Sequence, residues 1–204
     1  MKILCFGDSN TYRYDPRSYF GGQYNARHRW VDLLAERIGC TAVNAGENGR
    51  KIPVRPGDLQ RFDLMLANQR PLDLFLIMLG TNDLLQGSSP EVITKRMEYF
   101  LTRIGLESNK IILLGMPPMQ LGEWVEDPAL IRASLELNRL YHALALRLEI
   151  SFADAGKWDI ALAYDGVHFT EEGHQIFAEK LYHYLTKEIK LCWKKERKHR
   201  NLHC

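Results

Sequence analysis

The stretch LDLFLIMLGTND, residues 72–83, carries the strongest signal for the fold. Residues 72–79 are almost entirely apolar, and the run ends at Gly80. An apolar run this short, bounded by a turn residue, is typical of a strand that is buried on both faces of a sheet. Four further runs have the same form, at residues 3–6, 41–44, 111–114 and, more weakly, 150–153.

Amphipathic stretches between these runs predict helices. Apolar side chains recur at helical spacing over residues 30–38, 90–104 and 128–148, and from residue 170 to about residue 190. Strands that alternate with helices predict an α/β fold with three layers, in which helices cover both faces of a parallel sheet. The ligands of such sheets bind beyond the carboxyl ends of the strands.

The chain has 204 residues and shows no internal repeat or linker, which predicts one domain over residues 1–193. Residues 194–204 form a basic C-terminal tail, which we expect to be the solvated, frayed end of the last helix.

Composition excludes several classes of protein. Hydrophobic residues make up 46% and charged residues 25% of the chain, as in ordinary soluble proteins, and the net charge of +2 does not indicate a nucleic-acid partner. No run approaches the length of a membrane span, and the apolar run at residues 3–6 is too short for the hydrophobic core of a signal peptide. The four cysteines form neither a CxxC pair nor a metal-ligand spacing. We therefore expect a cytoplasmic protein with reduced thiols, no bound metal and no membrane partner.

Three motifs directly follow predicted strands, and a fourth precedes the last predicted helix. They read GDSN at residues 7–10, NAGENGR at 44–50, GTND at 80–83 and DGVHFT at 165–170. Each is weak alone, since it also fits a turn, a glycine-rich loop, a helix cap or a surface pair. Together they bring a serine, a backbone donor, an amide and a histidine with its carboxylate to one edge of the sheet. Acyl transfer requires that set of groups.

These motifs resemble, in order, the four sequence blocks of the SGNH (GDSL-like) hydrolases. The resemblance implies a flavodoxin-like sheet, with Ser9 as nucleophile, His168 as base and Asp165 as the group that orients the base. It also implies an oxyanion hole made by the backbone N–H groups of Ser9 and Gly49 and the side chain of Asn82. No cofactor is implied.

Further stretches are similar to the bacterial arylesterase and acyltransferase branch of that family. They are RW at residues 29–30 with LLA at 33–35, PLDL at 71–74, DAG at 154–156 and the glutamate at 171. This likeness implies a small-molecule ester substrate and a capacity to form homo-oligomers. Two positions leave questions open: Asn10 stands where the family name expects leucine, and either Gly46 or Gly49 can be the second oxyanion donor.

Asn10, Tyr12, Arg50 and Phe169 are the candidate substrate-binding residues, because they adjoin the motifs. Arg50 fits a surface salt bridge equally well. Aromatic side chains near the motif loops are candidate pocket walls and equally candidate core residues: Tyr12, Tyr14, Phe20, Trp124, Trp158 and Phe169.

The function expected from these features is hydrolysis of short-chain, acetyl-like esters of sugars or of aryl or alkyl alcohols, through an acyl-enzyme. The alternatives are acyl transfer to alcohols and a non-catalytic flavodoxin-like module that binds a ligand at the same edge.

Overall fold

The computed structural model describes residues 1–18 and 22–200. In this part of the chain five parallel strands form one sheet in the order β2-β1-β3-β4-β5. Their bounds are β1 Lys2–Gly7, β2 Thr41–Gly46, β3 Leu74–Met78, β4 Ile111–Leu114 and β5 Ser151–Ala153. The predicted α/β fold with an all-parallel sheet is confirmed.

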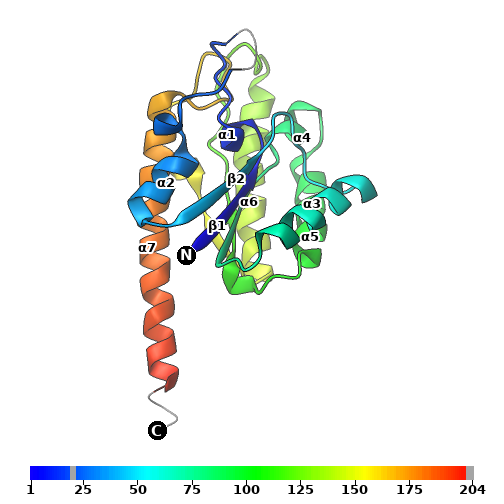
Figure 1. The fold of residues 1–204 in the computed structure, drawn as a ribbon. Coiled ribbons are helices and arrows are strands. Elements are labelled where there is room, and N and C mark those ends of the chain that lie inside the picture. The colour runs from blue at the N-terminus through cyan, green and yellow to red at the C-terminus, as the bar shows by residue number, and fades with distance from the viewer. Residues whose placement is uncertain (19–21, 201–204) are drawn as a thin grey trace.

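Helices cover both faces of this sheet (Figure 1). One face packs against α2 (Trp30–Ile38) and α7 (Glu171–Arg200), and the other against α3 (Pro56–Gln69), α5 (Pro90–Arg103) and α6 (Pro128–Arg147). Two short helices, α1 (Ser9–Tyr12) and α4 (Thr81–Leu85), follow β1 and β3 directly. Three single-turn segments complete the fold: η1 Ala26–His28, η2 Ser108–Lys110 and η3 Ala155–Lys157.

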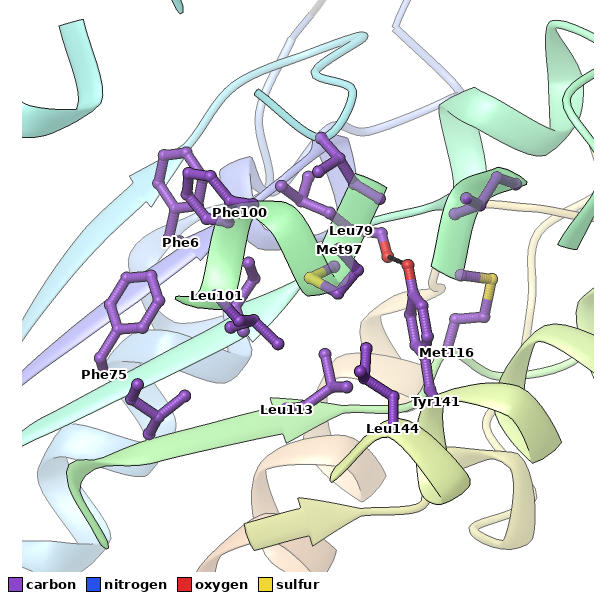
Figure 2. Packing of buried hydrophobic residues seen from close by; sticks show 14 of the residues in the cluster. Phe6, Phe75, Leu79, Met97, Phe100, Leu101, Leu113, Met116, Tyr141 and Leu144 are labelled. Atoms are coloured by element: carbon purple, nitrogen blue, oxygen red, sulfur yellow. Dashed lines mark hydrogen bonds between the residues drawn. The ribbon is translucent and has the colours of Figure 1, made fainter. Parts of the chain in front are cut away.

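The apolar runs are continuous because each central strand is buried on both sides. Along β1, Ile3 and Cys5 face the α2–α7 layer, whereas Leu4 and Phe6 face the α3–α5–α6 layer. Phe6 packs against Phe62 and Phe100, with ring centroids 5.0 and 5.9 Å away. Figure 2 shows part of this layer, in which the Tyr141 hydroxyl donates to the Leu79 carbonyl over 3.0 Å. The buried aromatic rings fix the strand whose end carries the first motif.

Besides the short helices α1 and α4, which were not predicted, the structure departs from the sequence-based prediction at α3, β2 and α7. α3 was not expected, because its core-facing side chains Leu59, Phe62 and Leu66 form only a narrow stripe while Leu64 is exposed. β2 continues to Gly46 because its pairing with β1 persists as far as Gly7.

The third departure is the length of the last helix. α7 runs to Arg200, so most of the basic tail continues the helix, and residues 201–204 lie outside the described residues.

Candidate active site

Ser9 begins α1 immediately after β1, at the carboxyl edge of the sheet. The Asp8 side chain accepts the N–H of Asn10 over 3.0 Å and so caps this short helix. The turn is tight: a Cβ on Gly7 would lie 2.1 Å from the Thr11 hydroxyl and 2.9 Å from the Met78 carbonyl. Glycine at position 7 therefore allows the end of β1 to pack this closely against α1 and β3, and the turn presents the Ser9 hydroxyl at the sheet edge.

Ser9, His168 and Asp165 form one continuous hydrogen-bonded chain. His168 Nε2 lies 2.9 Å from Ser9 Oγ, and His168 Nδ1 lies 2.7 Å from Asp165 Oδ2. The other Asp165 oxygen accepts the backbone N–H groups of Val167 and His168, each over 2.9 Å. With Asp165 ionised, Nδ1 carries the ring proton and Nε2 is left to accept the serine hydroxyl.

The surroundings of Asp165 keep this carboxyl ionised. Burial opposes its charge, but the His168 ring and the backbone N–H groups of His168 and Val167 outweigh that effect and lower its pKa. The carboxylate therefore fixes the tautomer of the imidazole and stabilises the imidazolium that forms when His168 takes a proton.

Three donors border the loop that follows β2. Asn82, in the first turn of α4, donates one amide hydrogen to the Arg50 carbonyl over 3.1 Å, which leaves its second amide hydrogen for a ligand. Within residues 1–18 and 22–200, the backbone N–H groups of Ser9 and Gly49 have no acceptor. Gly49 has a φ of 72°, a conformation that favours glycine.

The choice between Gly46 and Gly49 follows from their hydrogen bonds. The N–H of Gly46 donates to the Asn44 side chain over 2.9 Å, so it is already engaged. A Cβ on Gly46 would also lie 2.1 Å from the Tyr12 backbone nitrogen, which gives this glycine a packing role. Because its N–H has no acceptor among the described residues, Gly49 is favoured over Gly46 as the candidate second donor to the oxyanion.

A model of the GDSL-like lipase/acylhydrolase family matches residues 5–176. The chain belongs to this family. The resemblance predicted from the four motifs is thereby confirmed.

Solved structures similar to this GDSL-like hydrolase include the native aryl esterase of M. smegmatis, at 27% identity and a TM-score of 0.78, with 91% of this chain and 98% of that one covered. A putative arylesterase from Agrobacterium tumefaciens is 27% identical, with a TM-score of 0.79 and the same coverage, 91% and 98%. A carbohydrate acetylesterase from Sinorhizobium meliloti shares the fold at 24% identity and a TM-score of 0.77, again with 91% and 98% covered. No curated protein matches the sequence.

Two of the four candidate substrate residues of this GDSL-like hydrolase turn inward. Asn10 is buried: its amide donates to the Val167 carbonyl over 3.1 Å and its carbonyl accepts the Phe169 N–H over 2.9 Å. Phe169 is fully buried, with its ring against His174 and Phe177. Substrate contact by these side chains stays a prediction; in this structure the polar atoms of Asn10 are satisfied internally and the Phe169 ring belongs to the core.

Arg50 is committed to internal contacts as well. Its guanidinium donates to the carbonyls of Gly7, over 2.8 Å, and Ala45, pairs with Glu47 over 2.6 Å, and lies 4.3 Å from the Phe6 ring centroid. This cation holds the loop after β2 against the end of β1, and its pair with Glu47 is the salt bridge that was expected as the alternative to a substrate contact. Tyr12 is half-buried.

Two aromatic side chains flank the imidazole. The centroid of the Tyr14 ring lies 4.6 Å from that of His168, and the Trp124 ring lies 4.8 Å away, edge-on. Both also line a cavity of about 630 Å³, together with Tyr164 and Asp165. The sequence analysis did not single out Tyr164. The signal available in the sequence was an aromatic residue directly before the motif carboxylate Asp165.

Nowhere in the described ranges does a helix combine the length and apolar character needed to cross a bilayer. The same residues hold no group of three or more histidine, cysteine, aspartate or glutamate side chains placed to bind a metal ion. Phe20 lies outside the described residues, and Trp158 packs against Phe177 in the core.

Proposed function

We propose that this carboxylic ester hydrolase cleaves short-chain, acetyl-like esters of sugars or of aryl or alkyl alcohols through an acyl-enzyme on Ser9. The observation that carries the proposal is the unbroken chain of hydrogen bonds from Ser9 through His168 to Asp165. The arylesterase and carbohydrate acetylesterase named among the similar structures support the substrate classes.

In the first half-reaction, His168 Nε2 takes the hydroxyl proton while Ser9 Oγ attacks the ester carbonyl carbon. The carbonyl oxygen becomes an oxyanion, which the N–H groups of Ser9 and Gly49 and the amide of Asn82 stabilise. Loss of one such donor typically lowers kcat by about 100- to 1,000-fold. As the tetrahedral intermediate collapses, His168 returns the proton to the leaving alcohol oxygen, and the acyl group stays on Ser9.

In the second half-reaction, His168 deprotonates a water molecule that attacks the acyl-enzyme. The carboxylic acid leaves, and Ser9 regains its proton. The alternative is that an alcohol takes the place of this water.

The test is turnover of p-nitrophenyl acetate and p-nitrophenyl butyrate by the wild type, Ser9→Ala and, as a matched control, Ser108→Ala at an exposed serine of η2. We expect Ser9→Ala to lose on the order of 1,000-fold or more in kcat while Ser108→Ala stays at the wild-type rate. Equal turnover by Ser9→Ala, or none by the wild type, contradicts the proposal and leaves the binding-module alternative. Ester product that appears only when an alcohol is added identifies acyl transfer.

A further inference from the structure

The cavity beside His168 is built from three chain segments that hold one another in place. Tyr164 donates its hydroxyl to the Pro16 carbonyl over 2.7 Å. The backbone N–H groups of Glu123 and Trp124 donate to the carbonyls of Tyr164 and Asp165, over 3.2 and 3.1 Å. These bonds tie the loop after β1 and the loop before α6 to the segment that carries the triad acid, so the shape of the cavity is linked to the triad.

The walls of this cavity are aromatic and turned toward solvent. Trp124 is 47% exposed and Tyr164 is 60% exposed, and the Tyr14 and Trp124 ring centroids are 6.5 Å apart. Exposed large aromatic side chains that cluster at a cavity mark a binding surface more often than a structural one.

The direction of proton transfer decides which half of an ester lies here. The carbonyl oxygen must point to the proposed oxyanion donors, the N–H groups of Ser9 and Gly49 and the amide of Asn82. The leaving oxygen must lie beside His168 Nε2, which donates its proton. Since Tyr14 and Trp124 touch both the imidazole and the cavity, the alcohol half leaves the tetrahedral carbon toward this cavity.

The cation at the rim, Arg17, already has partners. Arg17 is bound to Asp15 over 2.9 Å and to Glu171 over 3.0 Å. A sugar ring needs several polar partners, whereas a flat aromatic ring needs only the faces and edges of other rings. The rim therefore fits an aromatic ring better than a sugar.

We propose that the cavity walled by Tyr14, Trp124 and Tyr164 binds the alcohol half of the ester and selects aromatic alcohols over aliphatic ones. This inference rests on the proposed serine esterase function, since the assignment of the two sides of the site depends on Ser9 and His168. It goes further because it names the cavity that receives the leaving alcohol and the residues that discriminate between alcohols.

The test compares phenyl acetate with ethyl acetate, because both leave the same acetyl group on Ser9 and differ only in the alcohol. The variants are Trp124→Leu and Tyr164→Leu, which keep apolar bulk in the cavity wall and remove the aromatic ring. Tyr99→Leu, at a tyrosine of α5 that is 52% exposed, is the matched control.

We expect Trp124→Leu and Tyr164→Leu each to lower kcat/KM for phenyl acetate by about 3- to 10-fold, the worth of one aromatic contact. For ethyl acetate we expect a smaller fall, because its alcohol half has no ring to contact the aromatic walls, and Tyr99→Leu should alter neither value. An equal fall for both esters would mean that the rings only support His168, and no fall for either would mean that the cavity is not used. Both results overturn the inference while Ser9-dependent cleavage of ethyl acetate persists. Failure of the proposed function itself looks different, because neither ester is then cleaved in a Ser9-dependent way.

Discussion

Asn10 couples the two loops that supply the nucleophile and the base. It follows Ser9 directly, and its side chain holds the backbone on both sides of His168 through the Val167 carbonyl and the Phe169 N–H. The backbone carbonyl of Asn10 accepts the Trp30 indole N–H over 3.0 Å, which anchors Asn10 to α2. The distance of 2.9 Å between His168 Nε2 and Ser9 Oγ therefore depends on a residue that touches neither atom.

Asn10→Ala is expected to lower kcat by about 10- to 100-fold while KM changes little, because the base loses its fixed position but the substrate cavity keeps its walls. The variant also leaves a buried N–H unpaired at Phe169, so unfolding should become easier by about 1–3 kcal/mol. Steady-state kinetics and the rate of Ser9 sulfonylation by phenylmethanesulfonyl fluoride, measured below the melting temperature, check this. A rate of sulfonylation equal to that of the wild type would contradict the positioning role.

Asp8 makes the stability depend on pH. Burial raises its pKa from the usual 3.8 to about 6, against the opposing effects of the Asn10 N–H and the nearby His168. Because the folded state holds this proton more tightly than the unfolded state, the folded protein loses stability as pH rises from about 4 to about 6. The loss amounts to at most roughly 3 kcal/mol.

Asp8→Asn removes that titration. The variant should match the wild type near pH 4 and exceed its free energy of unfolding above pH 6 by about 1–3 kcal/mol. Urea unfolding at a series of pH values checks this. A difference between the two proteins that stays constant with pH would show that Asp8 does not titrate in this range.

At the scale of elements, an ion pair joins the loop after β2 to two helices. Asp83 of α4 is 1% exposed; it accepts the Ile52 N–H over 3.1 Å and the Arg96 guanidinium of α5 over 2.8 Å. Burial raises the pKa of Asp83, and Arg96 and the Ile52 N–H oppose that rise. Since Asn82 precedes Asp83 and bonds the Arg50 carbonyl, this pair also supports the proposed oxyanion hole.

Arg96→Met is therefore expected to lower the free energy of unfolding more than Asp83→Asn does. It leaves a buried carboxylate without its counter-ion, whereas the asparagine is neutral. With the partly exposed Arg96 taken into account, we expect a loss of about 1–3 kcal/mol near pH 8. The loss should be smaller at pH 5 than at pH 8, because burial raises the pKa of Asp83 and the variant lacks Arg96, one of the groups that oppose that rise. Thermal melts of both variants at the two pH values check the order, and a larger loss for Asp83→Asn would contradict it.

For the whole molecule, the sequence predicted what depends on local patterns. The five strands, the four helices predicted at residues 30–38, 90–104, 128–148 and from residue 170, and the family follow from apolar runs, caps and short motifs. The inward orientation of the Asn10 and Arg50 side chains could not be predicted in this way, because both side chains bond to segments that lie near them only in the folded chain. The aromatic cavity was only partly predictable, because Tyr14, Trp124 and Tyr164 come from three segments that no sequence period connects.

The domain boundary at residue 193 remains a proposal that deletion can test. The last side chain of α7 with described burial in the core is Leu185. Removal of residues 194–204 should therefore leave the melting temperature within about 2 °C of the full chain and the turnover of p-nitrophenyl acetate unchanged. A drop well beyond that, or lost activity, would place the basic tail within the functional domain.

The most direct test of the account is to trap the acyl-enzyme. Acid quenching of the protein during turnover of p-nitrophenyl acetate, followed by peptide mass mapping, should find one acetyl group on the peptide that contains Ser9. The Ser9→Ala protein should carry none. An acetyl group on another residue, or turnover by the wild type without any acetylated Ser9, would contradict the account.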